Sequence, residues 1–442
     1  MPFKIAKKAL KHVQGLTLEE WGVAIFAVFL QIQVTIFADG DYLGLRLGLS
    51  DFLIPFAGLY ILFSLLTKRS VWPCWSSPWL YGWLGALVIV MSIALLNGYM
   101  VNNELSNWAF YNKYLGFFIL LAYFLLGGWI TSNVIDKGRL LTIFMNVFTG
   151  FMILLMIAST VSLFIQFFAS SHLWLSMYPW DGLAANRNAF MVLYVLAFSF
   201  VIFSYSKDEH FMPFWMQSLF WVFMPTFLIF NDSRTGWIAS LLLLVILFCR
   251  HPLIKLKKIV LFLIVGIAIA VVPYMVKTNV NSYILNGMQM KYLLSAMNKQ
   301  GGQLDYFGDQ KRHLAVEDGL ELYKQHNPII GSGLGSYKPF QIEKRGEFID
   351  VIDFTALWLL TETGALGLFM FAAFFVMCVY RLYLLSYKNK YNSSSFYRAI
   401  FTFLIIFALM SVLHELLYTR VLWFVAGLGL ITVSSKQLNK NS

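Results

Sequence analysis

The chain has 442 residues, of which 59% are hydrophobic and only 12% are charged. A soluble globular domain carries about 25% charged residues, so this composition excludes one and indicates an integral membrane protein. The net charge of +11 does not indicate a nucleic-acid partner, because the lysines and arginines gather in short loops between apolar runs, as they do in cytoplasmic loops.

Apolar runs of about 17–25 residues recur along the chain, and each is long enough to cross a bilayer as a helix. The alternation typical of barrel strands is missing, so an all-α polytopic membrane protein is expected. About twelve membrane-spanning helices are predicted, in chain order at residues 20–37, 49–66, 79–97, 115–131, 140–168, 189–205, 213–230, 236–249, 259–276, 354–380, 399–413 and 420–434.

The basic short loops determine the predicted topology. Lys68 with Arg69, and the cluster from Arg250 to Lys258, fall in loops that the positive-inside bias assigns to the cytoplasm. Both termini are then cytoplasmic, and the long polar segment lies on the other side of the membrane. The expected organisation is residues 1–276 with nine spans and short loops, residues 277–353 as a large periplasmic loop with surface helices, and residues 354–442 with three spans and a cytoplasmic tail.

Two arginines on the outer side contradict the usual charge bias. Arg234 lies in the segment SRTG at the outer end of a span, and Arg312 lies in a predicted amphipathic surface helix at residues 311–325. An anionic ligand would explain both, because the planar guanidinium binds phosphate through two hydrogen bonds and keeps its charge. The alternatives are an Arg234 that pairs with Asp232 at the membrane surface and an Arg312 that is a solvated charge.

A glycine-rich segment follows the Arg312 helix. Gly331, Gly333 and Gly335 resemble a phosphate-binding loop, but the Gly-Lys-Ser/Thr ending and a preceding strand are missing, so a nucleotide site is not expected. Glycines at this spacing fit a tight turn that requires positive φ. The HExxH, CxxC and clustered-carboxylate patterns are also missing, so neither a metal nor a cofactor is predicted.

Two residues are candidates for a general base. Asp353 lies where the long loop re-enters the membrane, and it is either that base or the N-cap of the next span. His414, beside Glu415 at the outer end of the eleventh span, is the alternative, because a histidine titrates near neutral pH. His313 and His326 rank below His414.

Three motifs in one order resemble the O-antigen ligase and O-antigen polymerase superfamily. They are the Arg234 motif, the Arg312 helix with the HNPIIGSG segment that follows it, and Leu357…Glu362-Thr363-Gly364…Gly367. The resemblance spans roughly residues 190–370 by motif and the whole chain by span count. It implies a GT-C-like fold in the bacterial inner membrane and a metal-independent, inverting glycosyltransferase.

The resemblance also implies substrates and site residues. Family members move a glycan from undecaprenyl pyrophosphate to an acceptor hydroxyl at the periplasmic face. Arg234 and Arg312 would hold the pyrophosphate, with Arg187 as a weaker third candidate. Where the ligase pattern has histidine followed by asparagine, this chain has Asp353 and Phe354, which is similar to polymerase members. We therefore expect polymerisation of O-antigen or related surface-polysaccharide repeat units, and a chain-length regulator is a partner compatible with that function.

Other functions stay open from the sequence. An O-antigen ligase would join the finished glycan to lipid A–core. A polysaccharide or ion transporter would also use about twelve spans, but it should place charged residues near the middle of several helices, whereas here they gather at the outer rim. A structural partner in an envelope-assembly complex would need neither Arg234 nor Arg312.

Overall fold

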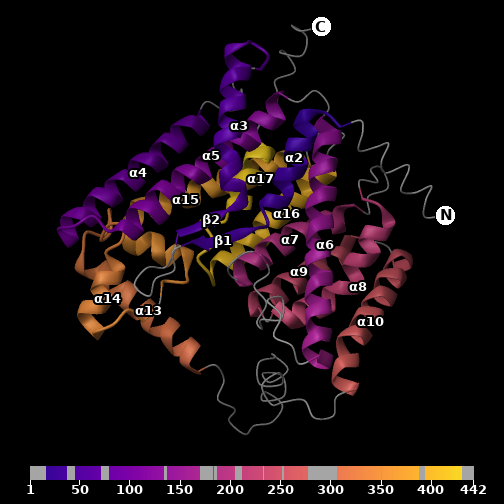
Figure 1. Cartoon of the computed structure of the whole chain (residues 1–442). Coiled ribbons are helices and arrows are strands. Elements are labelled where there is room, and N and C mark those ends of the chain that lie inside the picture. The colour runs from indigo at the N-terminus through magenta and orange to yellow at the C-terminus, as the bar shows by residue number, and fades with distance from the viewer. Residues whose placement is uncertain are drawn as a thin grey trace.

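The structure is a computed structural model that describes residues 16–36, 45–70, 79–133, 137–169, 183, 187–204, 212–231, 233–250, 253–276, 306–349, 351–387 and 394–430. Most of these residues are helical (Figure 1). The helices are α2 (Leu18–Phe29), α3 (Leu49–Leu66), α4 (Trp79–Asn102), the π-helix η1 (Ala109–Leu115), α5 (Gly116–Asn133), α6 (Lys137–Ala169), α7 (Arg187–Phe203), α8 (Phe214–Asn231), α9 (Arg234–Arg250), α10 (Leu253–Val276), α13 (Tyr306–Gln325), α14 (Tyr337–Arg345), α15 (Thr355–Tyr387), α16 (Ser394–Ser411) and α17 (Arg420–Leu430).

The helices coincide with the predicted apolar segments, since each predicted span overlaps a helix. Five described helices are long and apolar enough to cross a membrane: Leu49–Leu66, Leu80–Asn102, Ala109–Asn133, Gly138–Val161 and Thr355–Tyr387. Shorter apolar helices cover Asn188–Phe203, Phe214–Ile229, Ser395–Ser411 and Arg420–Gly429. These helices support a polytopic helical membrane protein, while the twelve crossings and the side of each loop stay predictions.

The predicted end of the first membrane span, residues 20–37, is wrong. The prediction runs to residue 37, but α2 ends at Phe29, and the chain continues as strand β1 (Gln33–Ile36), which pairs antiparallel with β2 (Leu45–Gly48). Three of the four residues of β1 are β-branched, and such side chains favour extended backbone over helix. The fold is therefore not purely α-helical, and this short ribbon brings Gln33 and Leu47 to the candidate site.

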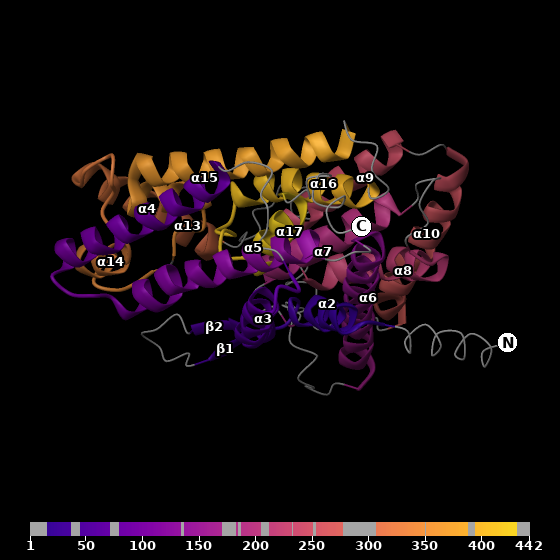
Figure 2. The same ribbon diagram turned by 90° about the horizontal axis from the view of Figure 1, so that it is seen from above.

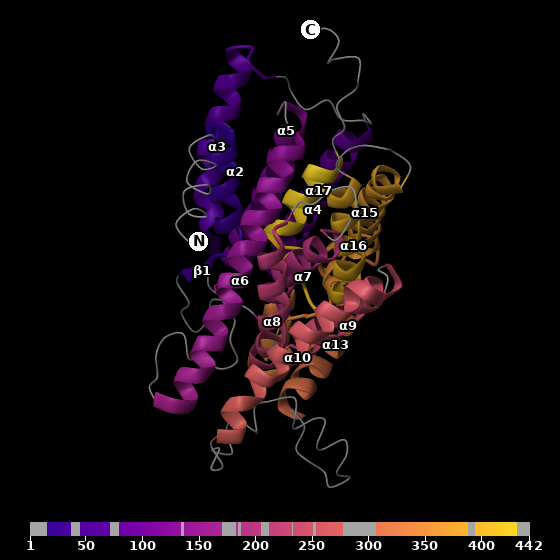
Figure 3. The same cartoon turned by 90° about the vertical axis from the view of Figure 1, so that its right-hand side faces the viewer.

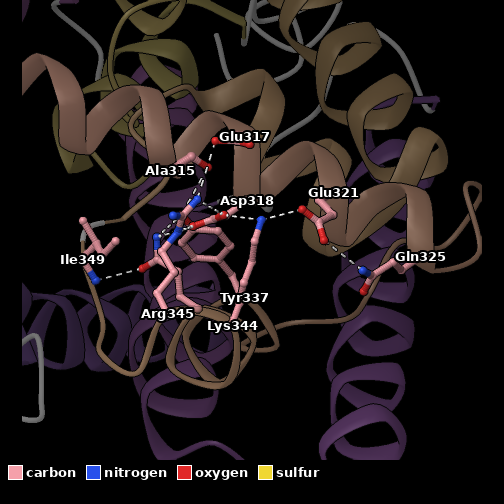
Figure 4. A network of polar contacts seen from close by, with 10 residues as sticks. Ala315, Glu317, Asp318, Glu321, Gln325, Tyr337, Lys344, Arg345 and Ile349 are labelled. Carbon is pink, nitrogen blue, oxygen red and sulfur yellow. Dashed lines mark hydrogen bonds and ion pairs between the residues drawn. The ribbon is translucent and has the colours of Figure 1, made fainter.

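A buried polar network joins α13 and α14, the helices in the described part of the long loop (Figure 4). Asp318 of α13 is fully buried and accepts hydrogen bonds from Arg345 Nε at 2.7 Å and Lys344 Nζ at 2.9 Å. Gln341 Nε2 adds another at 3.1 Å. Burial alone would raise the pKa of Asp318, but these donors outweigh it and lower the pKa. A charged Asp318 thus fastens α14 to α13, and both helices lie beside α4 and α15 (Figures 1 and 2).

Helix α15 is interrupted, where the sequence predicts one continuous span. Gly364 has a φ of 71° and a ψ of −174°, so the helix ends and restarts at this residue. The glycine-rich segment supplies the missing backbone partners: Ser332 N donates to Thr361 O at 2.8 Å, and Ala365 N donates to Pro328 O at 2.9 Å. Non-helical backbone at membrane depth requires such partners, because lipid offers none.

The glycines of that segment allow the close approach. Gly331, Gly333 and Gly335 have φ values of 73°, 94° and 81°, in the left-handed region that glycine adopts without strain. A Cβ on Gly333 would lie 2.0 Å from the backbone nitrogen of Gly98 on α4. The glycine-rich segment therefore connects α4 to the break in α15 through its backbone.

Candidate active site

A cleft of about 190 Å³ is formed by segments that are far apart in the sequence. They are β1 and β2, η1, the starts of α5 and α7, the residues before α15 and the turn before α17. Its polar side chains include Gln33, Asn112, Lys113, Asn188, Asp353, His414, Glu415, Thr419 and Arg420. Both base candidates, Asp353 and His414, thus line one cleft.

Arg312 and Asp353 form an ion pair at this cleft. Arg312 Nε lies 2.8 Å from Asp353 Oδ2, and the two side chains are 36% and 24% exposed. A pair this accessible to water stabilises a fold by only about 0–1 kcal/mol. An anion with several oxygens can therefore replace the carboxylate on Arg312 without a large loss of stability.

His414 is held in a buried cluster of hydroxyl and amide groups. Its Nε2 lies 2.6 Å from Thr235 Oγ1, and its Nδ1 lies 3.2 Å from Asn188 Nδ2. Because an amide nitrogen only donates, Nδ1 is the acceptor and Nε2 carries the proton that points to Thr235. Ser233 Oγ completes the cluster by donating to Asn188 Oδ1 at 3.1 Å. This arrangement matches a neutral imidazole with both nitrogens engaged.

Two of the predicted pyrophosphate-binding arginines stand at helix starts beside this cluster. Arg234 is exposed and is the first residue of α9, next to the Thr235 that contacts His414. Arg187 is the first residue of α7, next to Asn188, and its side chain lies outside the described part of the chain. The amino ends of both helices thus meet at His414. The amino end of a helix carries a partial positive charge of about half an elementary charge, which favours binding of an anion.

A buried lysine in the cleft is absent from the residues predicted from the sequence. Lys113 Nζ lies 2.6 Å from Glu415 Oε1, and the two side chains are 6% and 19% exposed. The ammonium also lies 4.2 Å from the ring centre of Trp358, 4.7 Å from that of Tyr418 and 5.0 Å from that of Trp108, within the range of cation–π attraction. One signal was available, since Lys113 lies at the predicted outer end of a span, where the positive-inside bias expects few positive charges, as it does for the two arginines.

A second buried ion pair, also missed, supports the lining of the cleft. Arg420 Nε lies 2.6 Å from Asp51 Oδ1, and the two side chains are 10% and 8% exposed. Tyr123 OH donates to the same carboxylate oxygen at 2.7 Å. Removing either charge would leave the other buried without its counterion, so this contact holds the start of α17 against the start of α3.

Thr355 connects the two base candidates. Its Oγ1 donates to His414 O at 2.8 Å and accepts from Leu416 N at 3.2 Å. Thr355 is the first residue of α15, and Asp353 precedes it by two positions. The carboxylate and the turn that carries the imidazole are therefore attached to each other through one side chain.

The remaining candidates lie away from the cleft. His313 is exposed on α13, and His326 Nδ1 contacts Leu322 O at 3.0 Å at the end of the same helix. Neither histidine lines the cleft. Asp232, the alternative partner of Arg234, lies outside the described residues. Across the described ranges, His, Cys, Asp and Glu side chains form no group of three that could hold a metal ion.

Comparison with known protein families covers part of the chain that forms this site. Residues 219–372 match the protein family described as O-Antigen ligase, and no match was found among curated proteins. The matched range contains Arg234, Arg312, the glycine-rich segment and Asp353, and it ends before His414. The resemblance seen in the sequence motifs is thus confirmed over residues 219–372, where the chain is similar to the O-antigen ligase family.

Proposed function

We propose that the chain is a glycosyltransferase of the bacterial inner membrane. It moves a glycan from undecaprenyl pyrophosphate to an acceptor hydroxyl at the periplasmic face, and it polymerises repeat units of O-antigen or a related surface polysaccharide. The family match supports membrane chemistry of the ligase and polymerase type. The observation that carries the proposal is the Arg312–Asp353 pair, at a cleft beside which α9 begins with Arg234.

The first step is binding of the donor pyrophosphate. Because the Arg312 guanidinium is 36% exposed and only weakly stabilised by its carboxylate partner, a phosphate oxygen can take the place of Asp353. Arg234 and the amino ends of α7 and α9 add positive charge near the same cleft, and Arg187 is proposed to contribute from the first position of α7. A preorganised donor facing the charge that develops on the leaving group contributes about 3–4 kcal/mol.

The second step is transfer to the acceptor. The acceptor oxygen forms a bond to the anomeric carbon, and the pyrophosphate leaves with the electron pair of the bond that joined it to this carbon. The configuration at the anomeric carbon is therefore inverted. The hydroxyl proton passes to Asp353, which donor binding has released from Arg312. A positioned base of this kind contributes about 10²–10⁴ in rate. The guanidinium groups supply the positive charge, so we propose a metal-independent reaction.

His414 is the weaker candidate for the base. Its Nε2 and Nδ1 contact Thr235 and Asn188, so proton transfer through either nitrogen would first break a hydrogen bond inside the cluster. We assign the proton acceptor to Asp353. His414 then has a positioning role, in which it holds the starts of α7 and α9 at the cleft.

The lipopolysaccharide gel profile of a deletion strain tests this function. The strain would carry wild type, Arg234→Ala or Asp353→Ala at matched expression. A polymerase predicts that deletion leaves the core bearing a single repeat unit, and that both variants reproduce this pattern. Full activity of both variants would contradict the mechanism, and an unchanged profile in the deletion strain would exclude O-antigen as the product.

An O-antigen ligase is the second candidate, because the matched family is described by that activity. In this case the same gel gives a different result. The deletion strain would show bare core, while long glycan would accumulate on undecaprenyl pyrophosphate. The acceptor would then be lipid A–core in place of a growing glycan chain, with the same roles for Arg312 and Asp353.

A further inference from the structure

A second cavity, of about 430 Å³, lies at the other end of α5. The cleft includes Gly116 at the start of this helix and the cavity includes Asn133 at its end, so about 26 Å separate them at 1.5 Å per residue. That distance approaches the roughly 30 Å of a hydrocarbon core, which places the cavity at the opposite membrane surface. Arg69 lines the cavity and Lys68 precedes it in the chain, and the positive-inside bias assigns both to the cytoplasm.

Four helix ends enclose this cavity: the starts of α2 and α6 and the ends of α3 and α5. Figure 3 shows α2 and α3 side by side along one edge of the molecule. The charged side chains in its lining are Glu19, Glu20, Arg69 and Arg139. Their formal charges cancel, so the cavity presents both signs of charge.

Part of that charge is already paired inside the protein. Arg139 Nε lies 2.8 Å from Glu20 Oε1, while 48% of the Arg139 side chain stays exposed. Tyr60 OH donates to Glu19 Oε1 at 3.0 Å. A guanidinium has five N–H donors and a carboxylate has about four acceptor positions, so both kinds of group retain capacity for a ligand.

Two lining residues contain a buried polar atom without a hydrogen-bond partner in the described structure. They are Ser70 Oγ and Trp129 Nε1. Most buried side-chain polar atoms in proteins have a partner, so unpartnered ones require an explanation. Ser70 and Trp129 thus add polar groups to the lining beside the charged side chains.

The outer side of α3 supplies an apolar surface next to these charges. Phe63 lines the cavity and is 56% exposed, and Leu59 and Leu66 on the same helix are 64% and 74% exposed. In a membrane protein such a surface faces acyl chains, because a helix that is apolar on its exposed face is stable only in lipid. A lipid with its headgroup in the cavity would have its acyl chains along α3.

We propose that this cavity binds the headgroup of a zwitterionic glycerophospholipid, with one phosphate diester and one ammonium group. The phosphate contacts Arg69 and Arg139, and the ammonium contacts Glu19. Guanidinium groups suit the phosphate, because their planar fork matches its oxygens, and the carboxylates suit the ammonium. The two carboxylates select phosphatidylethanolamine over the anionic phosphatidylglycerol. This site is separate from the proposed active site and does not depend on its function.

Native mass spectrometry of the delipidated full chain, with either lipid added at equal concentration, tests the proposal. Wild type should bind phosphatidylethanolamine about tenfold more tightly than phosphatidylglycerol, since one charge-assisted hydrogen bond contributes about 1.5 kcal/mol. Arg69→Gln should weaken phosphatidylethanolamine binding about tenfold, and Glu19→Gln should remove the preference between the lipids. Lys68→Gln is the matched control, because this exposed neighbour of Arg69 does not line the cavity, and binding should be unchanged.

Three results would overturn the proposal. Equal binding of both lipids by wild type would exclude the ammonium contact. An equal loss in Lys68→Gln would show unspecific attraction at the membrane surface. Displacement of the lipid by millimolar inorganic phosphate would identify a free phosphate as the ligand. Melting temperatures without lipid identify any misfolded variant, and Arg139→Gln repeats the measurement should Arg69→Gln fail to fold.

Discussion

The Arg312–Asp353 pair allows the chemical role of an arginine to be separated from its role in the fold. Its side chains are 36% and 24% exposed, so water screens the pair and its loss should cost the fold only about 0–1 kcal/mol. Arg312→Gln keeps a hydrogen-bond donor and much of the side-chain length. We therefore expect a melting temperature close to that of wild type.

The reaction rate should fall much further. If Arg312 stabilises the charge that develops on the leaving pyrophosphate, its removal raises the transition-state barrier by about 3–4 kcal/mol, which is a loss of roughly 10²–10³-fold. A structural effect of at most about 1 kcal/mol cannot produce that loss. The two magnitudes are thus far enough apart for one variant to decide between the two roles.

The assay is elongation of a synthetic lipid-linked repeat unit by purified protein, with melting temperature measured on the same samples. Arg345→Gln is the control, because Arg345 lies in the same loop and donates to the fully buried Asp318 from Nε and Nη2. This control should lose about 1.5–3 kcal/mol of stability while its folded fraction stays active. The reasoning is refuted if Arg312→Gln keeps wild-type activity, or if it loses stability as Arg345→Gln does.

Three further changes test the frame around the site. Gly333→Ala should prevent stable folding, because the φ of Gly333 is 94° and a Cβ there would lie 2.0 Å from the backbone of α4. Gly346→Ala is the control, because Gly346 has a φ of 82° but open space around it, and this change should lower stability by only about 1–2 kcal/mol. Expression level and melting temperature compare the two variants. Lys113→Met should lower the free energy of unfolding by about 3–5 kcal/mol, because it leaves the Glu415 carboxylate without its counterion. Adding Glu415→Gln should restore most of the lost stability, and a double-mutant cycle measures this coupling. The pKa of Asp318 is lowered in the folded chain, so its contribution to stability is present above the unfolded pKa of about 3.9 and is lost as pH falls through the folded pKa. Pepsin cleavage of α13 and α14 should therefore rise on acidification in wild type, whereas Asp318→Asn should be cleaved readily throughout and lack this pH dependence.

The structural features that depend on residues close together in the chain could be predicted from the sequence. Apolar runs located the helices because both helix formation and burial in lipid act on contiguous segments. Arg234 and Arg312 stood out because a positive charge on the predicted outer side contradicts the positive-inside bias. The turn at Gly331 and Gly333 followed from the backbone freedom of glycine. Each of these properties can be recognised within about twenty residues of sequence.

What could not be predicted depends on contacts between distant residues. Lys113 pairs with Glu415, 302 positions away, and Asp51 pairs with Arg420, 369 positions away, so their partners emerge only when the helices pack. The break in α15 at Gly364 needs backbone partners from the glycine-rich segment. The sequence of α15 alone therefore predicts one continuous helix, just as the β-branched residues of β1 are compatible with the end of a span.

The same distant contacts hold the proposed reacting groups together. Arg312 lies on α13, which is attached to α15 where Thr361 Oγ1 donates to a backbone oxygen of α13 at 3.2 Å. Asp353 precedes α15, whose first residue, Thr355, is hydrogen-bonded to the turn that carries His414. Because the glycine-rich segment closes the break in α15, one backbone frame carries the arginine, the carboxylate and the histidine cluster. The weak ion pair can therefore open for a substrate while the frame stays in place.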